Sequence, residues 1–255
     1  MFRGAREKSL SLNSAFVFPA DLSPSEARRV QERVPPAVIR RDRLGRVRTV
    51  AGADIALRGD NGYAAVILYS FPDLVEIERV SSSGKLKFPY VPGLLAFREI
   101  PLLLEAFASL RNSPDLILAD AHGWAHPRRA GMACHLGLVL DIPTIGCAKS
   151  VLVGQYKMPA AARGSTAALW DKKPDKKPDQ RTDSKTVRKT DAKNDQTEVI
   201  GRVVRTRAGV KPVFVSCGHR VSLPTAVRLV LACSDGYRIP KPQREADHWV
   251  KHLRG

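Results

Sequence analysis

Residues 115–150 hold the densest group of side chains that can do chemistry. An apolar run from Leu116 to Ala119 ends on Asp120, and a second apolar run ends just before Lys149. The loop after Asp120 supplies two histidines and two arginines, His122, His126, Arg128 and Arg129. A strand that delivers a carboxylate beside histidines and cations can hold a metal ion against a phosphate. The pattern therefore indicates an enzyme that acts on phosphodiesters.

Two further acids have similar surroundings. Asp54 stands inside the apolar run 50–56, and Glu99 follows a loop rich in proline and glycine, at the start of an expected helix. A carboxylate in an apolar strand is costly unless it is paired or binds a metal. Each acid alone could be a cap or part of a structural salt bridge. Together with Asp120, three acids on rigid elements favour a Mg²⁺ site that substrate phosphate and water complete.

The residues around these acids could have structural roles or chemical ones. Lys149 is either a solvated lysine or, at the same sheet edge as Asp120, a cation that neutralises phosphate. One of Arg128 and Arg129 is expected to contact a phosphate or an acid, because a guanidinium binds both in the same paired geometry. His122 is expected to be a hydrogen-bonded structural residue.

The segment 85–93 combines aromatic and basic side chains with a stiff backbone. Two prolines and a glycine within 88–93 exclude regular structure and predict a rigid loop. Phe88 and Tyr90 lie beside Lys85 and Lys87. Aromatic rings interleaved with cations suit stacking on a base while its backbone is held.

Composition favours a nucleic-acid partner over a membrane. The 255 residues contain 42 Lys and Arg against 25 Asp and Glu, a net charge of +17, and a plain basic tail is the alternative reading. No apolar run approaches the roughly 20 residues that span a bilayer, and the N-terminus lacks the apolar region of a secretion signal. Four cysteines without CxxC spacing favour a reducing compartment and give no support for a zinc site. We expect a cytoplasmic protein without membrane contact.

Apolar periodicity predicts alternating strands and helices. Ser23, Pro24 and Glu26 form a capping box that opens a helix ending before Pro35. Strands are expected at 48–56, 63–70, 74–82, 115–120, 143–148 and 212–217, and helices at 101–110, 131–140 and 222–234. A turn at 60–62 joins the first two strands. The strand–helix–strand order of 115–148 implies parallel pairing and an α/β fold.

The chain divides into an N-terminal tail, 1–22, and a single catalytic domain, 23–255. Residues 171–197 interrupt this domain with a repeated DKKP and almost no apolar side chain. Such a segment cannot bury enough surface to offset its ordering entropy, so a low-complexity disordered insertion is expected there. We expect the fold to tolerate this insertion rather than to use it.

Four stretches resemble the endonuclease V family: VAGADIA at 50–56, FPYVPGLLAFREIP at 88–101, the run 114–150 described above, and KPVFVSCGHRVSL at 211–223. They follow the family's order with similar gaps and span most of the chain. The resemblance implies a ribonuclease H-like fold, a mixed central sheet flanked by helices with acids at its strand ends.

The resemblance also implies Mg²⁺-dependent cleavage, with Mn²⁺ able to substitute, of DNA strands that contain deoxyinosine. The cut would fall at the second phosphodiester on the 3′ side of this lesion and leave 3′-hydroxyl and 5′-phosphate ends. A monomer is expected. Two alternatives stay open: a preference for inosine-containing RNA, and a non-catalytic nucleic-acid binding module on the same fold.

The family's catalytic positions are matched by Asp54, Glu99, Asp120, His126 and Lys149. Asp54 and Asp120 would bind the metal, and Glu99 would complete its site directly or through water. His126 would orient the attacking water or protonate the leaving oxygen. Lys149 would stabilise the charge on the phosphate.

Substrate contacts are implied as well. Tyr90 matches an aromatic wedge that fills the gap left when the inosine leaves the stack. Further contacts are expected from Pro92, Gly93, Gly123, Arg128 and His219. Backbone amides at 91–95 or at Gly123 are candidates to read the edge of the base.

Overall fold

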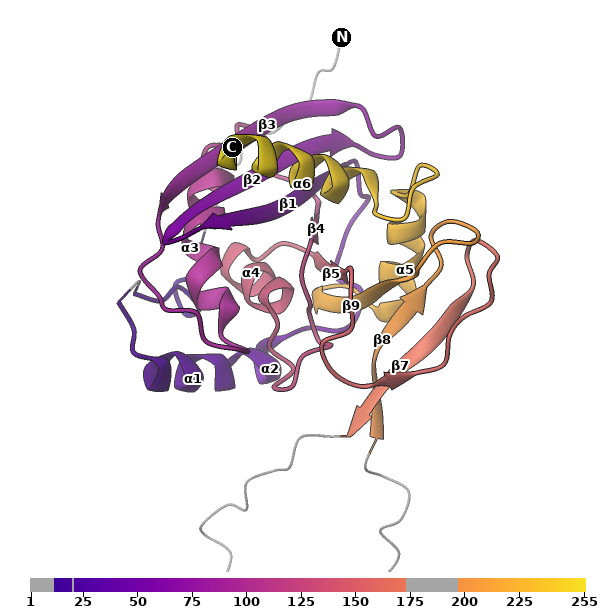
Figure 1. The fold of residues 1–255 in the computed structure, drawn as a ribbon, viewed down its shortest axis with the longest axis horizontal. Helices are drawn as coiled ribbons and strands as arrows, with labels where there is room; N and C mark the ends of the chain where they lie inside the picture. Colours follow the sequence, from indigo (N-terminus) through magenta and orange to yellow (C-terminus); the bar gives the residue numbers. More distant parts are fainter. Residues whose placement is uncertain (1–11, 20, 173–196) are drawn as a thin grey trace, which may run out of the picture.

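A nine-stranded sheet forms the centre of the computed structural model, which describes residues 12–19, 21–172 and 197–255 (Figure 1). The order across the sheet is β3-β2-β1-β4-β5-β9-β8-β7-β6. The strands are β1 (Thr49–Arg58), β2 (Asn61–Ser70), β3 (Glu76–Lys85), β4 (Leu116–Ala119), β5 (Thr144–Ala148), β6 (Gln155–Tyr156), β7 (Thr166–Lys172), β8 (Thr197–Val204) and β9 (Val213–His219). The helices are α1 (Pro24–Glu32), α2 (Val34–Ala37), α3 (Leu95–Ala108), α4 (Met132–Leu140), α5 (Leu223–Ala232) and α6 (Lys241–Arg254).

The pairing of the central strands decides where the predicted acids lie. β1, β2 and β3 form an antiparallel meander, whereas β4 runs parallel to both β1 and β5. β9, β8, β7 and β6 continue the sheet beyond β5 in antiparallel pairs. Because parallel strands end at the same edge, Asp120 and Lys149 follow β4 and β5 at a common edge. The expected fold class, a mixed sheet flanked by helices, is confirmed.

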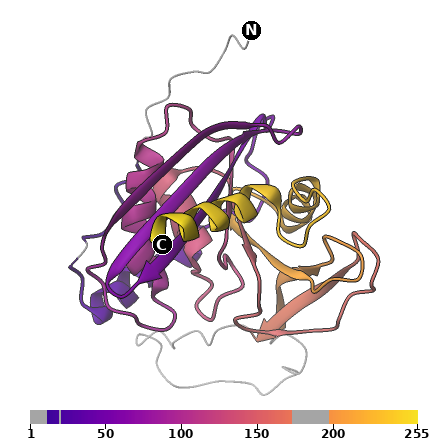
Figure 2. The ribbon, with the colours of Figure 1, turned by 45° about the horizontal axis from the view of Figure 1, so that its top comes forward.

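Helices cover both faces of this sheet, and Figure 2 shows α6 lying across the first strands. On one face, α3 and α4 pack with Ala51 and Ala53 of β1 in one apolar core. On the other face, α5 packs with Val50 and α6 packs with Ala56. Alternate residues of a strand point to opposite faces, so Asp54 points to the side covered by α5 and α6.

The helix starts that were predicted from capping residues are confirmed. The Ser23 hydroxyl accepts from Glu26 N–H, and the Glu26 carboxylate accepts from Ser23 N–H at 2.9 Å, which completes the capping box of α1. Ser222 caps α5 by accepting from Thr225 N–H at 3.3 Å. Both caps satisfy backbone donors that the first turn of a helix leaves without partners.

Several predicted boundaries are wrong. The first hairpin turns at Gly59 and Asp60, not at 60–62, because Arg58 pairs with Asn61 and Gly59 takes a φ of +59°. α3 begins at Leu95 rather than at 101, so it carries Pro101 in its interior. The segment 34–37, where the first helix was expected to have stopped, forms the short α2. Its prolines occupy first-turn positions, where a missing N–H costs little.

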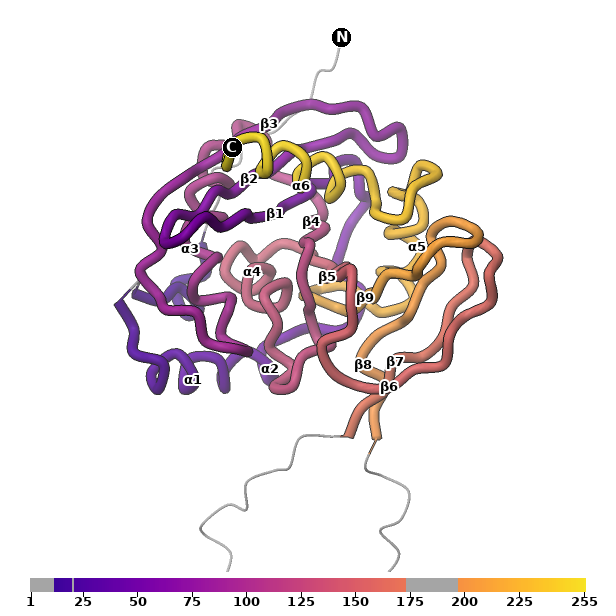
Figure 3. The backbone as a smooth tube through the Cα atoms, viewed as in Figure 1, coloured from indigo at the N-terminus to yellow at the C-terminus, as the bar shows by residue number. Residues whose placement is uncertain are grey.

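Parts of the predicted tail and insertion can be placed. Within 1–22, Asn13 N–H donates to Val139 O at 2.7 Å and Phe18 packs on Phe97, with ring centroids 4.6 Å apart. Most of the predicted insertion 171–197 lies outside the described residues. Its ends belong to β7 and β8, which Figure 3 shows ending together where Lys172 pairs with Thr197. Among the described residues, no helix is long and apolar enough to cross a membrane.

Candidate active site

Three carboxylates from distant parts of the chain lie together where β4 ends. Asp54 belongs to β1, Asp120 follows β4 and Asp247 belongs to α6, and one oxygen of each lies within 4.8 Å of the others. The Asp120 N–H donates to Ala53 O at 3.2 Å, so the strand pairing itself brings Asp120 level with Asp54. Three carboxylates at this spacing are suited to a hard divalent cation.

The position of Asp247 depends on how closely α6 approaches the sheet. Gly52 of β1 lies beneath the first turn of α6, where an added Cβ would fall 2.0 Å from Pro242 O. On the same turn Gln243 is fully buried, and its Nε2 donates to Cys147 O in β5 at 3.0 Å. Asp247 follows Gln243 by about one helical turn, so these contacts determine where its carboxylate lies.

Two lysines neutralise part of this cluster. Lys149 Nζ lies 2.5 Å from Asp120 Oδ2 and 2.9 Å from Asp247 Oδ1. Lys251 Nζ pairs with the other oxygen of Asp247 at 2.6 Å. Burial alone would lower the pKa of Lys149, but its bonds to Asp120 and Asp247 raise that pKa above the usual value. The cluster therefore already binds two cations, the ammonium groups of Lys149 and Lys251.

The acids themselves are under electrostatic strain that a further cation would relieve. Burial, followed by the negative charge of Asp120, raises the pKa of Asp54 to about 8. Burial also raises the pKa of Asp120, against the opposing effect of Lys149. Asp54 has no ion pair with any described residue. An all-oxygen donor set with one unpaired carboxylate fits a divalent cation.

Glu99, the third acid predicted for the metal, approaches from α3 on the other face of the sheet. It is 6% exposed and lies outside the group of three carboxylates. Burial raises the pKa of Glu99 to about 8; Arg98 opposes this rise and the charge of Asp120 adds to it. The structure thus places Glu99 within electrostatic range of Asp120, and Asp247 is the third carboxylate of the group.

The two loop histidines differ in what their rings contact. The Nδ1 atom of His126 accepts from Arg128 N–H at 3.2 Å, and the ring also bonds to the backbone of Gly93. His122 bonds to the backbone of Ser150, and its buried Nδ1 has no hydrogen-bond partner among the described residues. Burial lowers the pKa of each imidazole to about 4, so both are neutral at pH 7. The structure leaves a free ring nitrogen on His122 rather than on His126.

Arg128 and Gln31 hold the end of the rigid loop 88–93 in place through Gly93. Arg128 Nε donates to Gln31 Oε1 at 2.5 Å and its Nη2 donates to Gly93 O at 2.7 Å. Gln31 Nε2 donates to the same carbonyl at 2.8 Å. Gly93 takes a φ of +78°, and a Cβ there would lie 2.8 Å from Arg128 Nη2. Arg128, predicted to contact substrate, therefore positions the loop in this structure.

One aromatic side chain of the loop is available for stacking. Tyr90 is 69% exposed and Pro92 is exposed beside it. Phe88 is 3% exposed and packs against Phe97 with ring centroids 5.7 Å apart. The expectation that both rings stack on bases is wrong for Phe88, which anchors the loop in the core instead.

Arg129 contacts acids, as was expected for one of the two arginines. It is 3% exposed and takes a φ of +53°. Its guanidinium pairs with Glu198 and, at 3.1 Å, with Asp171, and it donates to His126 O at 2.8 Å. Arg129 therefore ties the His126 loop to the β7–β8 hairpin.

Gly123 is packed inside the protein. Its N–H, a candidate reader of the base, donates to Ser216 Oγ at 3.0 Å. An added Cβ would lie 2.2 Å from Cys217 O, so the position accepts only glycine without a shift of β9. Gly123 thus holds the loop that follows Asp120 against the sheet.

His219 lies at the far end of the sheet from the carboxylates. It pairs with Thr144 at the start of β5, whereas Lys149 follows the end of that strand. Its Nδ1 accepts from Ile39 N–H at 3.4 Å, and burial lowers its pKa to about 4. The structure does not bring His219, expected among the substrate contacts, to the acidic cluster.

Asp247 is the site residue that the sequence interpretation missed. The stretch 241–254 carries Pro242 in its first turn, and Ala246 and Val250 are spaced to share a buried face. Asp247 and Lys251 form an i,i+4 pair. These signals predict an amphipathic helix. They do not predict that its acid reaches β1 and β4, because that depends on docking.

Comparison with known proteins identifies the family to which this fold belongs. The sheet order and the three carboxylates define an α/β protein of ribonuclease H-like architecture with a candidate divalent-metal site. The family model of endonuclease V matches residues 32–248, and the chain belongs to the endonuclease V family. Endonuclease V of Roseiflexus sp. (strain RS-1) is 43% identical over 243 residues, which cover 95% of this chain and 99% of that protein.

Solved structures of the family have the same fold. Endonuclease V from Streptomyces avermitilis superposes with a TM-score of 0.78 at 38% identity, covering 93% of this chain and 96% of its own. Endonuclease V from Ciona intestinalis superposes with a TM-score of 0.70 at 26% identity, covering 90% and 97%.

Proposed function

We propose that this chain is a divalent-metal-dependent endonuclease that cuts DNA at deoxyinosine. The cut falls at the second phosphodiester on the 3′ side and leaves 3′-hydroxyl and 5′-phosphate ends. The observation that carries the proposal is the convergence of Asp54, Asp120 and Asp247 beside Lys149. The family adds support, because the Ciona intestinalis relative was crystallised with a 24mer DNA containing an inosine followed by a ribo-adenosine. The net charge of +17 suits a polyanionic substrate.

Mg²⁺ is the proposed ion, with Mn²⁺ as a substitute, because every donor is a carboxylate oxygen. Asp54, Asp120 and Asp247 would hold it, and Glu99 would contribute through water from the α3 side. Bound there, the ion would supply an activated water and neutralise charge on the phosphate.

The remaining roles follow from the contacts of each side chain. Lys149 would leave its carboxylate partners to stabilise negative charge on the phosphate. His126 is proposed for proton transfer and would first have to release Arg128 and Gly93. His122, which has a free Nδ1, is the alternative at the same step. Tyr90 would fill the gap left by the inosine and offset part of an unstacking cost of a few kcal/mol.

The test is cleavage of a duplex with one deoxyinosine in the presence of Mg²⁺. The wild-type protein should nick the inosine strand, while Asp120→Asn and Asp247→Asn should bind that duplex without cutting it. Asp73→Asn, an exposed acid in the turn before β3, is the matched control and should cut normally. An intact strand with folded wild-type protein would overturn the proposal. Full activity of Asp247→Asn would remove that residue from the site.

The Ciona intestinalis complex also makes RNA a candidate substrate, because a ribonucleotide follows its inosine. Two oligonucleotides that differ only in the 2′-hydroxyl at this position should be compared at one salt concentration. Faster cutting of the ribose form by tenfold or more would assign the protein to RNA. Tight binding of both without any cut would instead support a non-catalytic binding module.

A further inference from the structure

A strip of arginines runs along the extended segment before β1. Five of the nine residues from 40 to 48 are arginines: Arg40, Arg41, Arg43, Arg46 and Arg48. All five are exposed. We propose that this arginine strip is a second phosphate-binding surface. It binds nucleic acid at a distance from the cleavage site. The choice of partner rests on the proposed nuclease function, whereas the surface is a separate part of the molecule.

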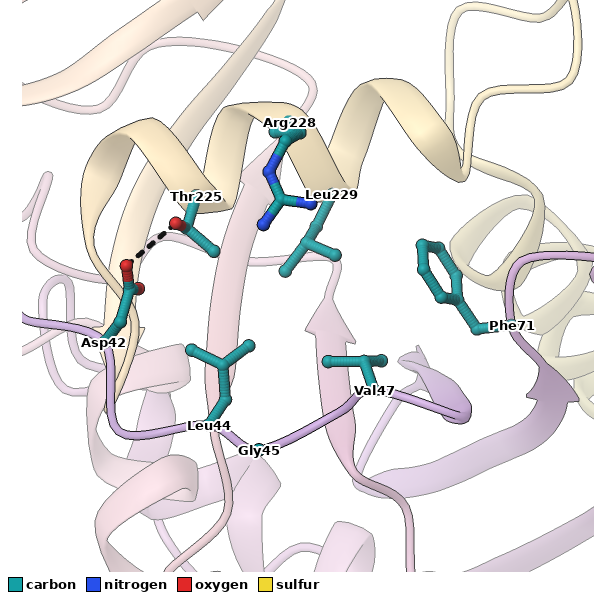
Figure 4. A pocket seen from close by; sticks show the side chains of 8 residues that line it. All are labelled: Asp42, Leu44, Gly45, Val47, Phe71, Thr225, Arg228 and Leu229. Atoms are coloured by element: carbon teal, nitrogen blue, oxygen red, sulfur yellow. Dashed lines mark hydrogen bonds between the residues drawn. The ribbon is translucent and has the colours of Figure 1, made fainter.

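The backbone of the strip is fixed while its charged groups face outward. Arg43 N–H donates to Arg220 O at 2.9 Å, and Phe71 N–H donates to Arg48 O at 2.7 Å. Figure 4 shows Leu44 and Val47 pointing into the groove beneath α5, so they anchor the segment from its inner side. A held backbone lowers the entropy cost of presenting several cations to one ligand.

The acid within the strip is turned away from the arginines. The Asp42 carboxylate accepts from Ser222 N–H at 2.7 Å and from the Thr225 hydroxyl at 2.9 Å. It therefore caps the start of α5. Arg228 lines the same groove beyond it and adds a sixth exposed cation (Figure 4).

The two end arginines of the strip have side-chain partners within the described part of the protein, whereas the central three have none there. Arg40 lies over the ring of Trp124 at 4.0 Å and pairs with a Glu198 oxygen at 3.8 Å, and Arg48 pairs with Asp115 at 4.0 Å. The central three, at 41, 43 and 46, have no ion pair with any described residue. A guanidinium binds phosphate oxygens in a paired geometry, so a row of free ones suits a phosphate backbone.

The strip lies at the opposite end of the parallel strands from the carboxylates. It precedes β1, and Asp54 stands five residues beyond Thr49, the first residue of β1. Five strand residues span about 17 Å, which corresponds to roughly five base pairs of duplex. A duplex engaged at the acids needs only about half a helical turn to extend that far, so longer DNA can contact both regions.

The test compares charge removal in two places. The strip variant carries Arg41→Gln, Arg43→Gln and Arg46→Gln. The control variant carries Lys157→Gln, Arg207→Gln and Lys211→Gln, which removes the same charge from exposed positions elsewhere. The probe is an undamaged, fluorescein-labelled duplex of about 60 bp, titrated at several salt concentrations.

The strip variant should lose affinity about tenfold or more near 0.1 M salt, and its log K against log salt should be less steep by about 0.9 per lost phosphate contact, up to about 2.7. The control should keep both values. Both variants should nick a short inosine duplex of about 12 bp at the wild-type rate when that DNA saturates the protein, because the strip contributes to binding and not to the reaction at the acids.

An unchanged salt slope in the strip variant, or an equal loss in the control, would overturn the proposal. Lost binding to vesicles containing anionic lipid, with unchanged DNA binding, would assign the strip to membranes and overturn it too. These outcomes use undamaged DNA and so do not depend on cutting. Failure of the proposed function would appear instead as wild-type protein that binds the short inosine duplex without nicking it.

Discussion

Replacing Gly52 with alanine should disturb the candidate site without changing any of its acids. An added Cβ would lie 2.0 Å from Pro242 O and 2.1 Å from Pro242 C, which are backbone atoms of the first turn of α6. Ordinary contact begins near 3.4 Å, so α6 would have to retreat by about 1.4 Å, the difference between 3.4 and 2.0. Asp247 moves with this helix, away from Asp54 and Asp120.

The size of the effect follows from this displacement. A misplacement of about 1 Å can reduce a reaction rate on the order of 100-fold, so cutting should fall by at least that factor. Forcing a methyl group into a packed position should also lower the free energy of unfolding by about 1–3 kcal/mol. The affinity for Mg²⁺ should weaken because the third carboxylate has moved away.

Nicking rates across a Mg²⁺ titration measure the loss of cutting and the loss of Mg²⁺ affinity. Urea unfolding measures the change in the free energy of unfolding. Gly84→Ala is the matched control, because its Cβ would lie 3.4 Å from Leu102 Cδ2, an ordinary contact in the same sheet. It should leave cutting and Mg²⁺ dependence unchanged. If Gly52→Ala cut at the wild-type rate, the close docking of α6 would not position a carboxylate that the reaction needs.

Three other substitutions probe the site through different observables. Lys149→Met leaves Asp120 and Asp247 without their shared cation and should destabilise the metal-free protein by about 1–3 kcal/mol. Mg²⁺ should restore part of this stability. An equal loss with and without Mg²⁺ in thermal unfolding would contradict this. Burial and Asp120 raise the pKa of Asp54 to about 8. Between about pH 4 and 8 the folded protein therefore keeps a proton on Asp54 that the unfolded chain has released, and the metal-free protein loses stability as the pH rises through this range. Asp54→Asn should flatten that slope in urea unfolding at pH 5 and pH 8, and an unchanged slope would refute the reasoning. Tyr90→Ala should leave unfolding within about 0.5 kcal/mol of wild type, because the ring is exposed. It should slow nicking tenfold or more and remove the fluorescence rise of a 2-aminopurine placed beside the inosine; an unchanged signal would exclude the wedge role.

Elements with local signals could be predicted from the sequence. β4 was predicted as an apolar run that ends on Asp120, and α1 was predicted from its capping box. The first hairpin turn was misplaced because Asn61 and Gly62 form a strong turn signal, whereas strand register moved the turn to Gly59. The predicted start of α3 was too late because Pro101 resembles a first-turn proline. The buried helix accommodates this proline in its interior.

The composition of the candidate metal site could be predicted only in part. Asp54 and Asp120 lie on neighbouring strands, and strand spacing brings them together. Asp247 joins them through contacts that no local pattern reveals: Gly52 admits the backbone of α6, and Gln243 bonds to β5. Glu99 shares the features that suggested a ligand, an acid on a buried element, but its helix packs on the opposite face.

The distance along the chain between the three carboxylates has a consequence for synthesis. Asp54 and Asp120 can come together as soon as β1 and β4 have paired. Asp247, however, is translated 127 residues after Asp120 (247 minus 120). At ribosomal speeds of about 5–20 residues per second, the nascent chain spends roughly 6–25 seconds with two of the three carboxylates. During that interval, close to messenger RNA and ribosomal RNA, the polypeptide lacks the third carboxylate of the candidate metal site, and hydrolytic competence should appear only when α6 docks.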